Sequence, residues 1–359
     1  MGTIKLVFVL ENYYPSIGGV ETLFQTLAEG LAKEHNILVI TRKLKHTKSY
    51  EVINDVHVHR VMTFGSRNLF TFLALPKILK LAKDADIINT TTYNAAPPAR
   101  LAARLLKKPC ILTVHEILGD RWGLNLGLLS AWVHKRLERL IIDLNFDLYI
   151  CVSQATRSDL INIKPKVHSR VVYNGVDTVF WDPARYDGQS IRDKYHLNGK
   201  YVCLFYGRAG ITKGAEYLVK SAKLVNDVHF FLILSKDKQA KKIYALAKGL
   251  SNVQIIDSVP RNELPNYIKM ADCISIPSLS EGFGYTTVES CCMGKPVVAS
   301  EVGSIPEVIF GNFILVNPKD PVSLAAGIIE LKAGRGNHAN YKDFSISEHI
   351  RTYKEVVLI

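Results

Sequence analysis

The sequence predicts an α/β protein with two Rossmann-like domains, each a parallel β-sheet covered by helices. Its 359 residues suggest two domains, because single domains commonly have about 150 residues. Short apolar runs alternate with longer stretches of helical periodicity, which is typical of a parallel sheet flanked by helices. This alternation starts again after residue 200, so we expect a second domain of the same class.

The first half of the chain contains six apolar runs of strand length. Polar or glycine-containing segments bound each run, which favours short buried strands over helices. The expected strands are Ile4–Leu10, Ile37–Ile40, Asp86–Asn89, Cys110–Val114, Leu148–Val152 and Arg170–Tyr173.

The second half repeats the pattern after a segment of weak periodicity, Thr178–Lys200, which is rich in Asp, Pro, Gly, Tyr and Arg. Such a segment is the best candidate for a domain boundary. We therefore expect one domain over residues 1–177 and another over residues 178–340, followed by a helix at 341–359. The expected strands of the second domain are Tyr201–Tyr206, His229–Leu234, Val253–Asp257, Cys273–Pro277 and Pro296–Ser300, and its helices include Ala215–Val225 and Asn262–Met270.

The composition is that of a folded globular protein with a basic surplus. With 48% hydrophobic and 22% charged residues, disordered, collagenous and coiled-coil chains are excluded. The 45 Lys and Arg residues exceed the 33 Asp and Glu residues by 12, and residues 1–180 hold eight of that excess. An anionic partner or surface is therefore expected.

Cysteine usage and hydropathy indicate a cytoplasmic protein. The six cysteines form no CxxC pair, which favours reduced core thiols over a disulfide framework or a zinc site. No apolar stretch reaches the ~18 residues of a spanning helix, so we expect a chain that is at most peripheral to the cytoplasmic face of a membrane. The cysteines are Cys110, Cys151, Cys203, Cys273, Cys291 and Cys292.

Polar residues follow many of the expected strands. In open parallel sheets, ligands bind beyond the carboxyl ends of the strands, so these residues are candidates for one polar cleft between the domains. In the first half they are Gly18–Glu21, Thr90–Asn94, His115–Glu116, Ser153 and Asn174–Asp177; in the second half they are Gly207–Arg208, Lys213–Gly214, Glu281–Gly284 and Glu289.

Arg208 and Lys213 carry the strongest electrostatic signal. They bracket a short loop between an expected strand and a helix whose N-terminus also favours an anion. Arg offers a planar fork and Lys a point charge, a pair suited to two adjacent phosphates. The alternative is two solvated basic residues in a loop.

The segment from Glu281 to Glu289 adds two carboxylates across a loop-to-helix turn. Gly282 and Gly284 lack Cβ atoms, so the backbone amides there can approach phosphate or sugar oxygens. A carboxylate can accept two hydrogen bonds from vicinal hydroxyls. The alternative is a surface glutamate followed by an acidic residue near a helix N-terminus.

Together these motifs resemble those of retaining GT-B glycosyltransferases of family 4. The resemblance spans roughly residues 4 to 310 with the motifs in the family's order, and the spaced glutamates with the Arg/Lys loop are its most specific part. Two departures concern substrate detail: Tyr-Thr-Thr-Val follows Gly284 where aliphatic residues are usual, and Cys291–Cys292 replaces a pair of small residues. The implied fold is GT-B, two Rossmann-like domains whose sheets face each other across a cleft.

The resemblance also implies roles for individual residues. Arg208 and Lys213 would hold the donor diphosphate, Glu289 the ribose and Glu281 the hydroxyls of the transferred sugar. His115 would contact that sugar near the reacting carbon; the alternative is a histidine that caps a strand. Further donor contacts would come from Gly18, Gly19, Gly207, Gly282, Phe283, Gly284, Tyr285 and Thr286, and acceptor contacts from Thr91, Asn94, Glu116, Arg121 and Trp122.

The implied reaction is transfer of a hexose from a UDP- or GDP-sugar to an acceptor hydroxyl with the anomeric configuration retained. In similar enzymes the leaving phosphate helps deprotonate the acceptor on the same face, without metal or cofactor. The helix at 341–359 would cross back to the first domain. Asp84-Ala85-Asp86 matches a metal-binding Asp-x-Asp pattern, but it precedes a strand, so we expect a solvated turn.

Residues 121–140 contain an apolar stripe beside basic residues. Trp122, Leu126, Leu129, Val133, Leu137 and Leu140 recur at spacings of three and four. Two interpretations stay open. The segment is an amphipathic helix on an anionic membrane near a lipid-linked acceptor, or a helix that packs its stripe into the core.

Three other functions are weighed against the transferase. A nucleotide-sugar epimerase or a glycan phosphorylase of the same fold would share the donor site. A basic nucleic-acid-binding protein is the more distant alternative, because no aromatic-basic RNA motif or zinc finger is present and two glutamates would repel a phosphate chain.

Overall fold

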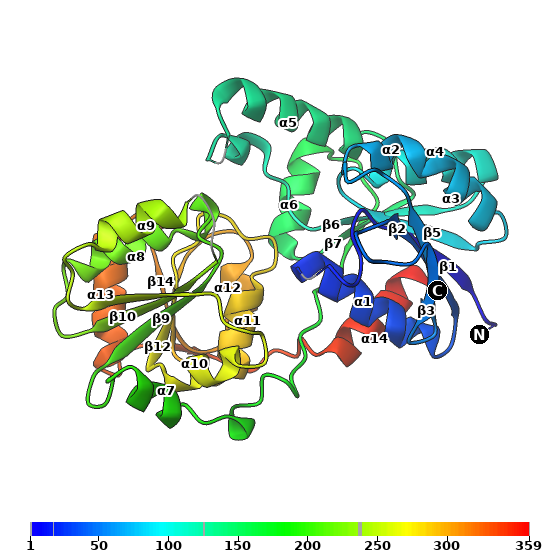
Figure 1. The fold of residues 1–359 in the computed structure, drawn as a ribbon. Helices are drawn as coiled ribbons and strands as arrows, with labels where there is room; N and C mark the ends of the chain where they lie inside the picture. The colour runs from blue at the N-terminus through cyan, green and yellow to red at the C-terminus, as the bar shows by residue number, and fades with distance from the viewer. Residues whose placement is uncertain (1, 17, 125, 236–238, 359) are drawn as a thin grey trace. The chain divides into compact units, whose positions relative to one another are not determined.

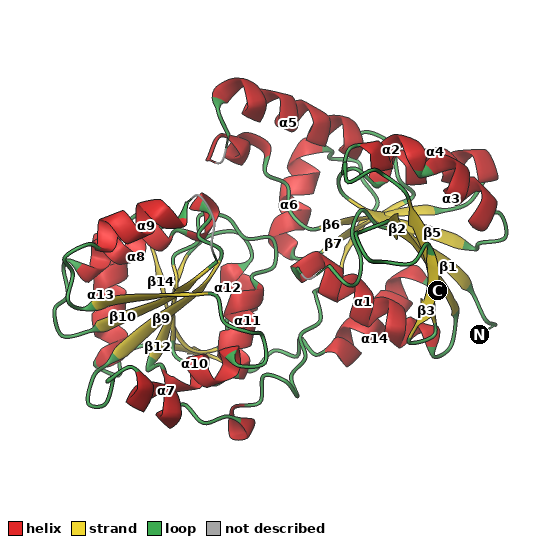
Figure 2. Ribbon diagram, in the orientation of Figure 1, coloured by secondary structure: helices red, strands yellow, loops and turns green. Residues whose placement is uncertain are grey.

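The chain folds into two compact units, each with helices on both faces of a sheet (Figures 1 and 2). A computed structural model describes residues 2–16, 18–124, 126–235 and 239–358. Unit 1 consists of Met1–Asp120, Leu128–Gly175 and Ser345–Ile359; unit 2 consists of Arg121–Gly127 and Val176–Phe344. The predicted α/β class, with two mostly parallel sheets, is confirmed.

Unit 1 contains an eight-stranded sheet in the order β3-β4-β2-β1-β5-β6-β7-β8, parallel except for the antiparallel pair β3 and β4. The strands are β1 (Lys5–Val9), β2 (Asn36–Arg42), β3 (Tyr50–Ile53), β4 (Val56–Val61), β5 (Ile87–Thr91), β6 (Cys110–Val114), β7 (Leu148–Cys151) and β8 (Ser169–Val171). The helices are α1 (Gly19–Ala32), α2 (Leu69–Leu73), α3 (Leu75–Leu81), α4 (Ala96–Leu106), α5 (Leu128–Ile142), α6 (Gln154–Ile163) and α14 (Ile346–Val357). The 3₁₀ helix η1 (Gly119–Leu124) begins in unit 1 and ends in the segment grouped with unit 2.

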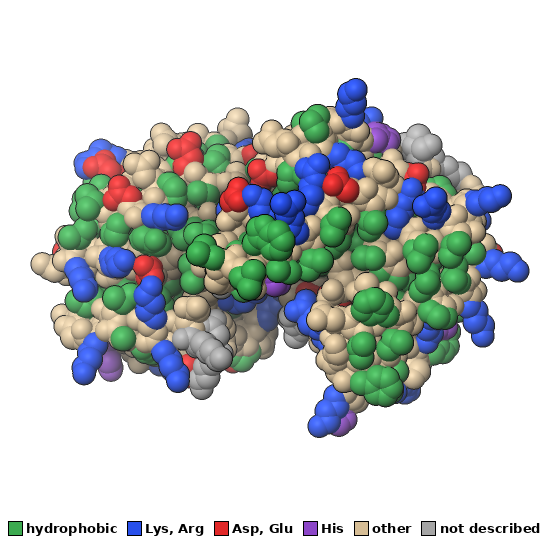
Figure 3. Space-filling view, turned by 90° about the horizontal axis from the view of Figure 1, so that it is seen from above, with side chains coloured by type: hydrophobic (Ala, Val, Ile, Leu, Met, Phe, Trp, Pro, Cys, Tyr) green, Lys and Arg blue, Asp and Glu red, His purple; other side chains and the backbone are tan. Residues whose placement is uncertain are grey.

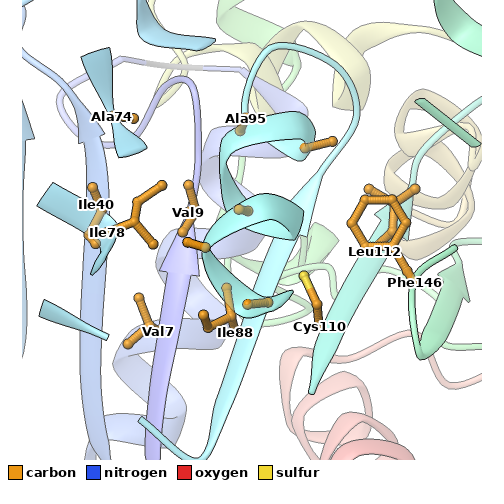
Figure 4. Packing of buried hydrophobic residues seen from close by; sticks show 14 of the residues in the cluster. Val7, Val9, Ile40, Ala74, Ile78, Ile88, Ala95, Cys110, Leu112 and Phe146 are labelled. Carbon is orange, nitrogen blue, oxygen red and sulfur yellow. The ribbon is translucent and has the colours of Figure 1, made fainter. Parts of the chain in front are cut away.

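Alternating side chains of the central strands fill two separate cores in unit 1. Val7 and Val9 of β1 pack with Ile78 of α3 on one face (Figure 4). Phe8 lies on the opposite face, where its ring meets that of Phe24 of α1 edge-on at 5.5 Å between centroids. Because successive strand residues point to opposite faces, both cores come from one short apolar run.

Helix α14 closes the second of these cores. Asn89 Nδ2 donates to the hydroxyl of Tyr353 at 2.6 Å, and both residues are buried. A Cβ on Gly30 of α1 would lie 2.2 Å from Ile350 Cδ1, so the missing side chain lets the two helices approach closely. The helix begins five residues later than the expected 341, because Ser345 caps it by accepting a hydrogen bond from the Glu348 amide.

Unit 2 contains a seven-stranded sheet in the order β11-β10-β9-β12-β13-β14-β15, parallel except for β14 and β15. The strands are β9 (Val202–Gly207), β10 (His229–Leu234), β11 (Val253–Asp257), β12 (Cys273–Ile276), β13 (Val297–Ser300), β14 (Gly311–Val316) and β15 (Asn337–Ala339). The helices are α7 (Gln189–Lys194), α8 (Ala215–Ala222), α9 (Ala240–Ala247), α10 (Leu264–Met270), α11 (Tyr285–Cys292), α12 (Ile305–Val308) and α13 (Pro321–Lys332), with 3₁₀ helices η2 (Pro183–Arg185) and η3 (Ile211–Lys213).

The cysteines carry free thiols, as expected. Five of them are buried and Cys292 is half-buried. Within the described ranges, none of the helices is both long enough and apolar enough to cross a bilayer.

Candidate active site

The loop after β9 holds two basic side chains in a backbone that only glycine permits. Gly207 has a φ of +151° and is followed by Arg208, whose side chain is exposed. Gly214, with a φ of +69°, ends η3 and begins α8; a Cβ there would lie 1.8 Å from the carbonyl oxygen of Pro277. This close approach places Lys213 beside the end of β12.

Lys213 and Glu281 form an ion pair. Lys213 Nζ lies 2.5 Å from Glu281 Oε1, which also accepts a hydrogen bond from Ser278 Oγ at 2.9 Å. The Glu281 side chain is only 9% exposed and that of Lys213 is 24% exposed. Arg208, by contrast, has no ion-pair partner among the described residues. The free cation and the paired cation therefore lie in the same loop.

A second tight turn fixes the Glu281 loop. Gly303 has a φ of +51°, and a Cβ there would lie 2.2 Å from the Glu281 carbonyl oxygen. That oxygen accepts a hydrogen bond from the Ser304 amide at 3.2 Å. Gly284, with a φ of +79°, then begins α11, so the backbone from Gly282 to Thr286 turns from loop to helix within five residues.

Glu289 lies on α11 beneath this turn. The Tyr206 hydroxyl donates to the Thr286 carbonyl at 3.2 Å and lies 3.5 Å from Glu289 Oε2. Burial raises the pKa of Glu289 to about 7, although Arg261, the Tyr206 hydroxyl and Lys213 act in the opposite direction. Near neutral pH this carboxyl is poised between its protonated and ionised forms.

In unit 1, Gly18 and Gly19 open helix α1, as the sequence predicts. Gly18 is fully extended, with a φ of −174°, so its conformation does not require glycine. A Cβ there would instead lie 2.3 Å from Glu21 Oε2, at the flexible end of that side chain. Glycine therefore suits this turn because it has no side chain, and not because of its backbone conformation.

His115 follows β6 and is neutral in this structure. Burial, reinforced by the nearby His349, lowers the pKa of His115 to about 4. Its ring meets the edge of Phe24 at 5.9 Å between centroids. Among the described residues, the buried His115 Nε2 has no hydrogen-bond partner. An unpaired buried polar atom of this kind is costly unless a ligand or water satisfies it.

The five residues assigned to the acceptor do not fall in one unit. Thr91 ends β5 of unit 1, Asn94 follows β5 and Glu116 follows β6. Asn94 Nδ2 donates to Glu11 Oε2 at 2.8 Å. Arg121 and Trp122 lie in η1, in a segment grouped with unit 2.

Sequence reasoning missed two residues that hold the site loops. Ser278, which bonds Glu281, directly follows the β12 region, so inspection of strand ends could have found it. Glu138 is buried on α5, where its carboxylate accepts hydrogen bonds from the Tyr93 hydroxyl and from the amides of Leu118 and Gly119 at 2.8–3.0 Å. Nothing in the pattern around Glu138 distinguishes it from a solvated glutamate.

The Asp84-Ala85-Asp86 pattern lies at the amino end of β5, as expected, away from the strand ends that carry the candidate site. Asp84 pairs with the side chain of Lys5, and Asp86 Oδ2 accepts a hydrogen bond from the Lys5 amide at 2.8 Å. Both carboxylates thus join the beginnings of two neighbouring strands. In the part of the chain that the structure describes, no group of three or more His, Cys, Asp or Glu side chains could hold a metal ion.

Comparison with known proteins assigns most of the chain to two sequence families. Residues 17–180 match Glycosyltransferase Family 4, and residues 187–346 match Glycosyl transferases group 1. The chain belongs to glycosyltransferase family 4. It is an enzyme that transfers a sugar from a nucleotide-sugar donor, and its two sheets make up the GT-B fold of this family.

Individual relatives match this family 4 glycosyltransferase over most of its length. An uncharacterized glycosyltransferase of Methanocaldococcus jannaschii is 26% identical over 91% of the chain and 88% of its own length. The α-monoglucosyldiacylglycerol synthase of Streptococcus pneumoniae is 26% identical over 82% of the chain and 71% of its own length. A structure of Anabaena HepE with UDP and glucose superposes with a TM-score of 0.75 at 19% identity, covering 99% of both chains.

Proposed function

We propose that this glycosyltransferase moves a hexose from a UDP- or GDP-sugar to an acceptor hydroxyl with retention of the anomeric configuration. The observation that carries the proposal is that one loop of unit 2 holds both Arg208, which has no ion-pair partner among the described residues, and Lys213, which pairs with Glu281. The arrangement offers two cations and one carboxylate, which suits a diphosphate bonded to a polyhydroxylated sugar.

Arg208 and Lys213 act on the leaving group. As the bond between the sugar and the diphosphate breaks, negative charge grows on the phosphate oxygens, and fixed cations stabilise that charge more than they stabilise the bound donor. Arg208 supplies the planar fork and Lys213 the point charge. Glu281, held by Ser278, accepts hydrogen bonds from hydroxyls of the transferred sugar.

The remaining donor contacts are proposed from the resemblance to family 4. Glu289 binds the ribose hydroxyls, and the backbone from Gly282 to Thr286, with Phe283 and Tyr285, provides amides to the sugar and phosphate. In unit 1, the unpaired Nε2 of the neutral His115 supports a hydrogen bond to a sugar hydroxyl. Gly18, Gly19 and Gly207 leave room for backbone contacts with the donor.

The proposed step uses no metal ion, because the two cations neutralise the diphosphate. The leaving phosphate oxygen accepts the proton of the acceptor hydroxyl on the face from which it departs, so the anomeric configuration is kept. Exclusion of water limits hydrolysis of the donor. Activity in the presence of EDTA is the expected result, and strict dependence on Mg²⁺ would contradict this step.

We propose a lipid-linked or otherwise membrane-associated acceptor, used at the cytoplasmic face of a membrane. A relative whose name specifies a glucosylated diacylglycerol supports this choice. The basic surplus of residues 1–180 supports an anionic acceptor or surface.

A donor screen tests the proposed function. The protein is incubated with labelled UDP- and GDP-sugars, with and without lipid extracts, and the release of nucleotide diphosphate and labelled product is measured. We expect acceptor-dependent release with one donor class. Formation of an epimer without an acceptor would indicate an epimerase instead, and phosphate-dependent release of a sugar phosphate from a glycan would indicate a phosphorylase.

A further inference from the structure

Helix α5 turns a row of large apolar side chains outward. Leu128 is 91% exposed, Leu129 77%, Trp132 57% and Leu140 64%. With Val133 and Leu137, which are also exposed, they recur at spacings of three and four along one helix and form a continuous patch. Single exposed leucines are ordinary, but a contiguous apolar patch marks an interaction surface.

The face of α5 that points into unit 1 is not the predicted stripe. The buried residues of α5 are Glu138 and Ile142, whereas Val133, Leu137 and Leu140 are exposed. The interpretation that this helix packs its apolar stripe into the core is therefore wrong. A single helix over residues 121–140 is also wrong, because α5 begins at Leu128 and leaves Trp122 in η1.

Helix α4 extends the patch and adds positive charge. Leu101 and Leu105 are exposed on α4, and Arg104, Lys107 and Lys108 lie beside them, lining a hollow together with Arg100 and its ion-pair partner Asp147. Arg100 Nε donates to the carbonyl of Leu144 at 3.3 Å, which joins α4 to the segment directly after α5. The exposed side chains named on α5 and α4 are called the α5–α4 surface below.

The surface has few acidic residues on its α4 side. Residues 64–108 contain eight Lys or Arg and two Asp or Glu. Seen from above, the part of unit 1 that carries these helices shows mostly hydrophobic and basic side chains, with few acidic ones (Figure 3). On α5 itself, the Arg136 guanidinium lies 5.4 Å above the Trp132 ring, so a cation covers the aromatic side chain at the edge of the patch.

We propose that the α5–α4 surface docks unit 1 on an anionic lipid bilayer. The leucines and Trp132 enter the boundary between headgroups and acyl chains, while Arg104, Lys107 and Lys108 contact lipid phosphates. A second copy of the chain fits less well, because a symmetric contact would bring this basic face against itself. The proposal rests on the proposed function only in giving the enzyme access to a lipid-linked acceptor.

Vesicle flotation tests the docking, and it needs no sugar nucleotide. The full chain is mixed with vesicles of phosphatidylcholine, alone or with phosphatidylglycerol. An apolar variant carries Leu129→Gln, Trp132→Gln and Leu140→Gln; a charge variant carries Arg104→Gln and Lys107→Gln. The control is Lys223→Gln with Leu224→Gln, an exposed basic and apolar pair of unit 2.

We expect the wild type and the control to float only with the anionic vesicles. Each of the other two variants should bind them about tenfold less, because the substituted side chains are exposed and their loss removes interfacial contacts without unfolding the chain. Absence of flotation, equal flotation on both vesicle types, or flotation unchanged in both variants would overturn the docking. So would a dimer in sedimentation that the apolar variant dissociates.

The flotation experiment and the donor screen can fail independently of each other. A chain that fails to float but releases nucleotide diphosphate keeps the proposed function and loses the docking surface. A chain that floats but uses no donor loses the proposed function alone.

Discussion

At the scale of single residues, the donor half of the site contains two cations in different states. Lys213 is neutralised by Glu281 and shielded from solvent, whereas Arg208 is exposed and unpaired among the described residues. In our proposal, the diphosphate binds the exposed Arg208 directly, whereas it rearranges the existing interactions of Lys213. The two substitutions should consequently differ in their effects on binding and on turnover.

Arg208→Ala should raise the donor KM and lower kcat, and Lys213→Ala should mainly lower kcat. Removing one fixed cation from a developing negative charge costs about 10²- to 10³-fold in rate. Steady-state rates with the donor found in the screen check this. Lys220→Ala, which removes the cation of a half-buried pair with Glu216 on α8, is the control. Near-wild-type turnover in either site variant would contradict the assignment of the diphosphate site.

The raised pKa of Glu289 predicts that the stability of the folded chain depends on pH. The ordinary pKa of a glutamate is 4.5 and burial raises that of Glu289 to about 7, so between these values the folded chain holds a proton that the unfolded chain has lost. The contribution of this carboxyl to the free energy of unfolding therefore falls, by about 1–3 kcal/mol, as the pH rises from 5 to 8.

Glu289→Gln removes this titration, so the variant should gain stability relative to the wild type as the pH rises. Urea unfolding at pH 5 and pH 8 measures the difference between the two proteins. Glu301→Gln, at an exposed position of the same unit, controls for the loss of a charge. A difference that is the same at both pH values would show that the pKa of Glu289 is not raised in the folded chain.

At the scale of elements, α5 has two functions on opposite faces. Its outer face carries the α5–α4 surface, and its inner face carries Glu138, which holds the Leu118 and Gly119 amides of the loop that follows His115. The same carboxylate holds the Tyr93 hydroxyl of the loop after β5. Helix α5 thus fixes two loops of the candidate site in unit 1.

Glu138→Gln should loosen those loops. The amide side chain has one acceptor oxygen instead of two, and loss of a buried hydrogen bond to a charged group costs about 1.5–3 kcal/mol. Hydrogen exchange at the Leu118 and Gly119 amides should become faster, while the fold is retained. Glu34→Gln, at an exposed carboxylate that pairs with Lys354, is the control. Unchanged exchange at both amides would contradict this role.

The elements that could be predicted are those whose local sequence pattern is enough to determine their secondary structure. Cys110–Val114, His229–Leu234 and Val253–Asp257 are strands with the predicted bounds, because each is a continuous apolar or alternating run. The hairpin of β3 and β4 was missed. Its turn consists of Asn54 and Asp55, which both have positive φ, and these residue types are enriched in two-residue hairpin turns for that reason. β14 and β15 were also missed: β15 is a mostly exposed strand at the edge of the sheet, and its neighbour β14 is mostly half-buried, so neither has a strong apolar pattern.

Some residues of the candidate site could likewise be predicted from local sequence pattern, and others could not. Arg208, Lys213 and Glu281 were predictable because glycines at strand ends mark where the backbone must turn. The contacts of Ser278 and Glu138 depend on which loops meet in space, which local pattern does not reveal. The outward direction of the α5 stripe was equally hidden, since an amphipathic pattern does not say whether core or membrane covers it.

At the scale of the whole molecule, the charge of +12 has at least two separate locations. Arg208 and Lys213 belong to unit 2, where they serve the donor in our proposal. The greater surplus of residues 1–180 includes the basic residues of α4 on the α5–α4 surface. In our proposals, the two similar units therefore bind two different anions: unit 2 binds a diphosphate and unit 1 binds an anionic bilayer.

The anomeric configuration of the product tests the central claim most directly. The wild type is incubated with an α-linked UDP- or GDP-sugar that the screen identifies, and the coupling of the anomeric proton in the purified glycoside product is measured by NMR. The proposed same-face departure of a diphosphate held by Arg208 and Lys213 predicts an α-linked product. A β-linked product would contradict it.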